Sequence, residues 1–296
     1  MENTVKFETI SFPKRLNSML KVDFRRMFKM KFFYILVACA LVIPILITVM
    51  MTMMDGSVSV NPQTGEETVM EGPENAWQSI GTLTSGTSED NTAGNRESGN
   101  VTDESNKAEA GAAAAMGGMD VMSMCNINMM YMLVAVFVCL FISSDFRSGY
   151  AKNLFTVRVR KGDYVISKTL AGFVCGALML VAYFVGAMLG GAISGLSFDL
   201  GELNVGNVVM CMIAKIFLML VFVSIFTLIS VAAKQRAWLS ICGSLGGGML
   251  LFMMVPMITP LGSTMINVIL CIAGGLMFAF GLGAASRVIL KKTSLV

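Results

Sequence analysis

Residues 237–286 contain no charged side chain. A membrane-crossing helix needs about 20 apolar residues, so this stretch can hold two such helices. Pro256, Pro260 and Gly262 can end one helix before the next begins. The whole chain is also apolar, being 55% hydrophobic and 14% charged with a mean hydropathy of +0.72. A soluble domain of this length could not bury so much apolar surface, so the sequence predicts an all-α polytopic membrane protein.

Six segments are apolar and long enough to cross a bilayer. The predicted transmembrane helices are residues 32–54, 121–142, 170–196, 206–232, 237–258 and 264–285. Nearly all lysines and arginines then fall on one side, in residues 1–31, in the loop 143–169, in the turn after the fourth helix and in the tail 286–296. The exceptions are Arg96, Lys107 and Lys215. Basic loops stay in the cytoplasm, so both termini are predicted to be cytoplasmic.

The segment 55–120 then lies outside the cell as a low-complexity loop. It is rich in Gly, Ser, Thr, Asn and acidic residues and lacks the apolar content for a core of its own. Two interpretations stay open for it: a solvated loop without a specific role, or a contact for substrate or a partner near Trp77.

The basic segment 14–30 predicts an amphipathic helix that lies in the membrane interface before the first span. Its apolar residues are Leu16, Met19, Leu20, Phe24, Met27 and Phe28, and its cations are Lys14, Lys21, Arg25 and Lys29. Such a helix can fix the topology of the chain, or it can act as an elbow that transmits force to the first span. The two roles are compatible.

The loop 143–169 has an ordered pattern of polar residues. Asp145 ends an apolar span, Gly149 and Asn153 follow, Arg160 stands in a basic turn, and Lys168 enters the next span. In this order the loop resembles that of the permease subunits of type-2 ATP-binding-cassette (ABC) exporters. The resemblance implies six spans, an interfacial elbow helix, and a cytoplasmic loop between helices two and three that couples the permease to its ATPase. An ordinary positive loop is the alternative.

We therefore expect a separate ATPase to bind this loop. A helix over residues 146–155 would present three aromatic side chains as apolar plugs, with nearby cations steering the partner. The predicted coupling residues are Asp145, Phe146, Arg147, Gly149, Tyr150, Lys152, Asn153, Phe155, Arg158, Arg160 and Lys168.

The resemblance also implies a location and partners. These are the bacterial cytoplasmic membrane and its lipid, an ABC ATPase that binds ATP and Mg²⁺, and a second permease, identical or paralogous. The expected cargo is an amphipathic peptide such as a bacteriocin, a drug or a lipid, moved outward by alternating access. However, the long loop here follows span one, and only a turn at 258–264 precedes span six. The substrate class therefore does not carry over.

Enzyme chemistry is not expected in this chain. It has no His, no G-x-x-x-x-G-K-[ST] loop and no C-x-x-C pair, and the predicted spans contain no acidic residue. We expect no cofactor, metal or nucleic acid to bind. A non-catalytic membrane sensor or a scaffold subunit of a secretion or stress complex is the alternative function; it would account for the spans but not for the ordered loop.

Polar residues inside the spans mark a possible substrate cavity, namely Asn126, Asn128 and Lys215. A structural alternative exists for Lys215. If residues 216–233 form the span, Lys215 lies at its outer end, and residues 200–214 lie flatter against the membrane. The spacing of Gly186 and Gly190 predicts close helix packing.

Overall fold

The computed structural model describes residues 11–55, 75–77, 127–156, 161–198, 205–234, 236–252, 255–259 and 264–292, and the backbone of two short strands. The strands, β1 (Val58–Val60) and β2 (Glu67–Val69), pair in antiparallel fashion. The predicted site residues Asn126, Arg158 and Arg160 and most of the predicted outer loop lie outside the described residues.

Five helices are long and apolar enough to cross a membrane, within the part of the chain that is described. They are α2 (Lys31–Met53), α5 (Met129–Arg147), α7 (Lys161–Ile193), α8 (Val205–Ala233) and α11 (Met265–Lys292). The chain is therefore a helical polytopic protein, as predicted. The predicted span 237–258 is divided into α9 (Ala237–Phe252) and the short α10 (Val255–Ile258). A helix of 16 residues such as α9 rises only about 24 Å, so the six-span topology stays a prediction.

The N-terminal helix α1 (Phe12–Lys29) precedes α2, and the extended residue Met30 separates the two. Its apolar face packs inward through Met19 and Met27, although Phe28, predicted on that face, is exposed. The helix exists as predicted. Its position in a membrane interface stays a prediction.

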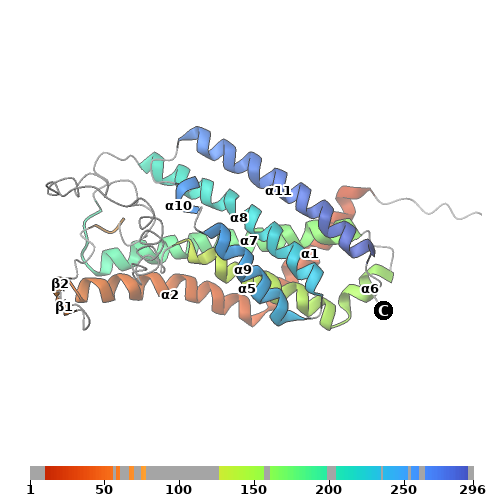
Figure 1. Cartoon of the computed structure of the whole chain (residues 1–296), viewed down its shortest axis with the longest axis horizontal. Coiled ribbons are helices and arrows are strands. Elements are labelled where there is room, and N and C mark those ends of the chain that lie inside the picture. The colour runs from red at the N-terminus through yellow and green to blue at the C-terminus, as the bar shows by residue number, and fades with distance from the viewer. Residues whose placement is uncertain are drawn as a thin grey trace, which may run out of the picture.

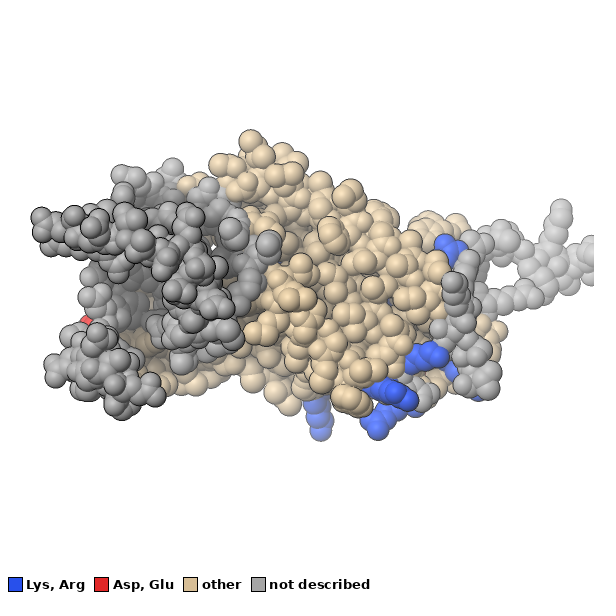
Figure 2. Space-filling model, in the orientation of Figure 1, with Lys and Arg blue, Asp and Glu red and all other residues tan. Residues whose placement is uncertain are grey.

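The helices form an elongated bundle with two different ends (Figure 1). The helices α1 and α6 (Tyr150–Thr156) and the C-terminal end of α11 lie at one end, while β1, β2 and α10 lie toward the other. Figure 2 shows blue lysine and arginine side chains gathered at the first end. The flank between the two ends is almost free of charge in this view, as a lipid-facing surface requires.

The helix α5 lies in the centre, with most of its side chains buried against α7, α8 and α9. A short polar chain joins three of these helices: Ser240 Oγ donates to Ser230 Oγ at 2.8 Å, and Cys139 Sγ lies 3.1 Å from Ser244 Oγ. By contrast, α11 rests on α8 and leaves much of its apolar surface exposed. Exposed apolar side chains of this kind suit contact with lipid or with a second membrane subunit.

Candidate functional site

The central helix α5 ends where its apolar run meets the sequence Asp145-Phe146-Arg147. Gly149 follows with φ +70°, a backbone conformation that residues with a side chain rarely adopt. The chain turns there and enters α6. The prediction of one helix over residues 146–155 is therefore wrong, because the left-handed Gly149 divides that segment between α5 and α6.

Four charged side chains from three helices meet beneath this turn, and we call them the ionic knot: Asp23, Arg26, Asp145 and Lys168. Lys168 Nζ lies 2.7 Å from Asp23 Oδ1 and 2.6 Å from Asp145 Oδ2. Arg26 Nη1 lies 2.7 Å from Asp145 Oδ1. The side chains of Asp23, Asp145 and Lys168 are fully buried. Two cations and two carboxylates balance, which is how a protein can keep charges out of water.

Neutral groups complete the ionic knot. The hydroxyl of Ser167 donates to Asp23 Oδ2 at 2.5 Å, and that of Tyr164 donates to Asp145 Oδ2 at 3.1 Å. The Lys168 ammonium lies 3.8 Å from the centre of the Phe141 ring, where a cation is attracted to the ring's electron density. Because so many contacts converge, the ends of α1, α5 and α7 are held in one geometry.

The residue that opens α6 is joined to the same group. The Arg26 guanidinium lies 4.1 Å from the centre of the Tyr150 ring. Burial, and then the Asp23 carboxylate, raise the pKa of Tyr150, so its phenol is neutral at physiological pH. Through Arg26 and Tyr150, the base of α6 contacts α1 directly.

The predicted coupling residues fall into two groups. Asp145, Phe146 and Lys168 are buried, and Tyr150 and Phe155 are half-buried. Phe146 and Phe155 both pack against Tyr164, with ring centres 6.3 and 5.4 Å from it. The expectation that these rings project as plugs is therefore wrong in this geometry, because they fill the underside of the loop. Arg147, Lys152 and Asn153 are exposed, and these residues are free to meet a partner.

Sequence reasoning missed half of the ionic knot, since neither Asp23 nor Arg26 was assigned a partner. A signal was present. Asp23 is the only acidic residue of α1, a helix otherwise rich in cations, and it occupies a position on the apolar face. A lone carboxylate among apolar residues needs a partner, and Lys168 supplies it.

A second polar cluster lies further along the bundle, around Lys215 of α8. Lys215 is 1% exposed, and its ammonium donates to Thr259 Oγ1 at 2.9 Å and to Asn128 Oδ1 at 3.2 Å. Tyr131 donates its hydroxyl to the Lys215 carbonyl oxygen at 2.9 Å. None of the ion pairs among the described residues includes Lys215. Its contacts are therefore neutral oxygen atoms.

The structure brings two of the three predicted cavity residues, Asn128 and Lys215, into contact. The helix α8 is continuous from Val205. The alternative of a separate, flatter segment is therefore wrong for residues 205–214. One helical turn further along, Leu218 lines an apolar cavity of about 480 Å³ between α8, α10 and α11. Asn267 and Cys271 of α11 and Ile258 of α10 line its other walls.

The described residues hold no group of three or more His, Cys, Asp and Glu that could bind a metal ion. The six described cysteines are free thiols. The candidate sites are thus an ion-paired support for a surface loop and a buried ammonium near an apolar cavity.

Residues 103–249 match the model of the ABC-2 family transporter proteins. The match supports an ABC-2 type permease. It spans α5 to most of α9, and so includes Asp145, α6, Lys168 and Lys215. The comparisons with curated proteins and with solved structures gave no match.

Together with the apolar helices, the family match implies a multi-pass membrane protein. Permeases of this family are membrane components that generally lack catalytic activity of their own, and the family implies an ABC ATPase as partner. The geometry of α6 and the ionic knot therefore bears on how such a partner would be engaged.

Proposed function

We propose that the chain is the permease subunit of an ABC exporter that moves an amphipathic substrate outward. A separate ATPase would bind ATP and Mg²⁺ and drive alternating access. The observation that carries this proposal is the ionic knot directly beneath α6, within a region that matches an ABC-2 transporter family. A loop that only fixed topology would need positive charge. It would not need buried ion pairs that connect three helices.

The ionic knot gives α6 a rigid support. Asp145 belongs to the end of α5 and Lys168 to the first turns of α7. Both belong to the ionic knot, to which α1 contributes Asp23 and Arg26. A push on α6 therefore moves the cytoplasmic ends of α1, α5 and α7 together. Exposed Lys152 and Asn153 would contact the ATPase, since their side chains have no internal role in the described structure.

The substrate would contact the cluster around Lys215. An amphipathic molecule has a polar group that suits the Lys215 ammonium and the Asn128 and Thr259 oxygens. Its apolar part suits the 480 Å³ cavity one turn away. A peptide, a drug and a lipid all meet this description. A second permease, identical or paralogous, would cover exposed apolar surface such as that of α11 and complete the pathway.

The decisive experiment begins with purification of the tagged protein from its native membranes in mild detergent. We expect a stoichiometric ABC ATPase to co-purify and to show vanadate-sensitive ATP hydrolysis. The D145N variant removes one charge of the ionic knot, and we expect it to keep the ATPase bound but to lose most of the substrate stimulation of hydrolysis. The matched control is D163N, because the ion pair that Asp163 forms among the described residues is with partly exposed Arg15, at 3.4 Å, outside the ionic knot.

A surface variant tests the coupling assignment even if D145N fails to fold. Lys152→Glu reverses an exposed charge without touching the ionic knot, and we expect it to weaken ATPase co-purification by about tenfold, equivalent to roughly 1.4 kcal/mol. If no ATPase co-purifies at a yield where it would be visible, the exporter proposal is wrong and a sensor or scaffold role gains support. If D145N and K152E both behave like the wild type, the coupling assignment is wrong.

A further inference from the structure

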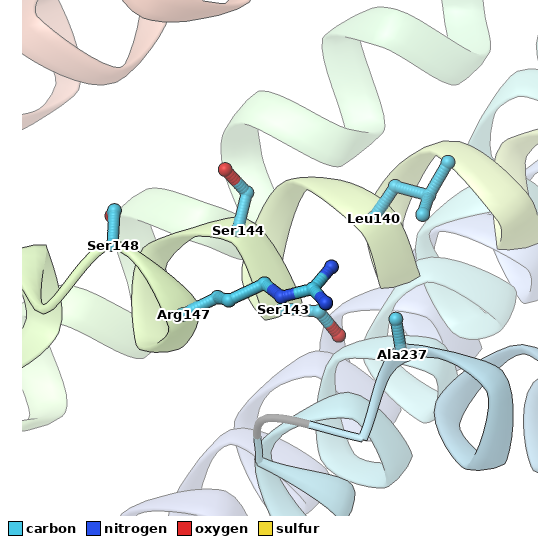
Figure 3. A pocket seen from close by; sticks show the side chains of 6 residues that line it. All are labelled: Leu140, Ser143, Ser144, Arg147, Ser148 and Ala237. Carbon is cyan, nitrogen blue, oxygen red and sulfur yellow. The ribbon is translucent and has the colours of Figure 1, made fainter.

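A small pocket of about 340 Å³ lies between the end of α5 and the start of α9 (Figure 3). Its lining residues are Leu140, Ser143, Ser144, Arg147, Ser148 and Ala237. None of them belongs to the ionic knot or to the Lys215 cluster, and none is acidic. The pocket lies at the basic end of the molecule, near α6.

Ser143 is the first sign that this pocket holds a ligand. Its residue is 2% exposed, and its hydroxyl oxygen has no hydrogen-bond partner among the described residues. Figure 3 shows the hydroxyl on the side of α5 that faces Ala237. A buried hydroxyl without a partner is costly, and native proteins rarely leave one in that condition. A ligand in the pocket that accepts a hydrogen bond would satisfy it.

The charges around Ser143 favour an anion. Arg147 is exposed, takes part in none of the ion pairs among the described residues, and extends along α5 toward Ser143 in Figure 3. Ala237 is the first residue of α9, and the first backbone bond of that helix runs from Ser240 N to Arg236 O at 3.1 Å. The N–H groups before Ser240 have no partner within the helix, so this terminus carries partial positive charge.

The surroundings of the pocket are amphipathic. Leu140 is one of its apolar lining residues, and the next residues of α9, Trp238 and Leu239, are 69% and 42% exposed. Tryptophan is enriched where membranes meet water. A pocket that combines one cation and three serines with apolar walls, beside exposed apolar side chains, matches a phospholipid with its phosphate at the polar groups and its acyl chains along α5 and α9.

We propose that this pocket binds a phosphate group, contributed by an anionic glycerophospholipid of the leaflet on the basic side of the protein. Arg147, the Ser143 hydroxyl and the start of α9 contact the phosphate oxygens, and the lipid tails lie against Leu140 and Trp238. The site is independent of the exporter proposal. It assigns the lipid a role in holding the end of α5 to the start of α9.

The test uses the full-length protein, freed of lipid in detergent. Unfolding temperature and native mass spectrometry are measured with phosphatidylglycerol, with diacylglycerol of the same acyl chains, and with inorganic phosphate. We expect phosphatidylglycerol to raise the unfolding temperature and diacylglycerol to have no effect. Competition by inorganic phosphate would support recognition of the phosphate group itself. If inorganic phosphate raises the unfolding temperature and phosphatidylglycerol does not, the pocket binds phosphate, but the proposal that a lipid supplies it is wrong.

Two variants and a control locate the site. We expect Arg147→Gln to weaken phosphatidylglycerol binding at least about tenfold, and Ser143→Ala to weaken it about threefold to tenfold. Without lipid, Ser143→Ala should unfold at the same temperature as the wild type or higher, because it removes an unsatisfied hydroxyl. Lys21→Gln removes an exposed cation of α1 and should bind lipid normally. If R147Q and S143A bind phosphatidylglycerol as tightly as K21Q, or if diacylglycerol protects equally, the proposal is wrong.

Discussion

At the scale of single residues, the two buried lysines differ in what surrounds them. Lys168 contacts two carboxylates, whereas Lys215 donates to the neutral oxygens of Asn128 and Thr259. An ion pair in a low-dielectric interior can offset the cost of losing water, but neutral acceptors offset less of it. An ionisable side chain inside a transmembrane helix is a candidate functional group, and the apolar cavity one turn away is the basis for proposing that Lys215 contacts the substrate.

Replacing Lys215 separates a functional role from a structural one. In Lys215→Met the buried charge is lost while much of the side-chain volume is kept, so we expect an unfolding temperature equal to that of the wild type or higher. Transport should fall by about tenfold or more, which corresponds to roughly 1.4 kcal/mol of lost interaction. The measurements are thermal unfolding in detergent and ATP-driven transport in proteoliposomes. A variant that loses stability and transport together would indicate a purely structural lysine.

The sequence predicted Asp145, Lys168, Asn128 and Lys215 as candidate site residues but did not pair them. Asp145 and Lys168 meet because α5 and α7 pack side by side, and Asp23 joins them because α1 lies across α7. Those contacts depend on how the helices are arranged in space, and a pattern along the chain carries no such information. The lone carboxylate of α1 indicated that a partner was needed but not which cation would supply it.

At the scale of the helices, close packing of α2 on α7 depends on a small residue at Gly186. A Cβ atom there would collide with the carbonyl oxygen of Leu41 and with the Pro44 ring of α2, and backbone atoms cannot move aside as a flexible side chain can. The glycine spacing at 186 and 190 indicated close packing from the sequence alone. The structure adds that the neighbour is α2.

We expect Gly186→Ala to destabilise the protein by about 1–3 kcal/mol, the usual cost of overpacking a tight interface. The matched control is Gly274→Ala on α11, where an added Cβ meets no atom within 4 Å. Alanine forms helices better than glycine, so G274A should match or slightly exceed the wild type in unfolding temperature. The measurement is thermal unfolding of both variants in the same detergent. Equal unfolding temperatures for G186A and G274A would contradict the packing of α2 against α7.

The lengths of the helices were less predictable than their presence. Hydropathy detects the part of a helix that lies in lipid, and the predicted span 170–196 therefore began at Leu170. The helix itself begins at Lys161, because backbone hydrogen bonds continue in the polar region where hydropathy gives no signal. The break at Gly149 was also missed, since a glycine next to an apolar run is compatible with either a helix or a turn.

At the scale of the whole molecule, the two ends differ in charge and in what they hold. One end carries α1, α6 and the C-terminal end of α11, and β1, β2 and α10 lie toward the other. The charge pattern predicted the basic end from sequence, because orientation depends on local lysine and arginine content rather than on packing. Whether residues 237–258 cross the membrane was harder to predict from the sequence, because the structure divides this predicted span into α9 and α10.

Cysteine labelling tests both the orientation and this crossing. We expect Lys152→Cys and Arg236→Cys to react with a membrane-impermeant maleimide only after the cells are permeabilised, and Thr264→Cys to react in intact cells. All three positions are exposed, and the wild type reports the background from its native thiols.

The residues from Ala237 to Ile258 would rise about 33 Å as continuous helix, enough to cross a hydrocarbon core of about 30 Å even though α9 alone is too short. If Arg236→Cys and Thr264→Cys react from the same side, α9 and α10 form a hairpin that enters and leaves by one face. In that case the protein has five spans, and its N- and C-terminal ends lie on opposite sides of the membrane.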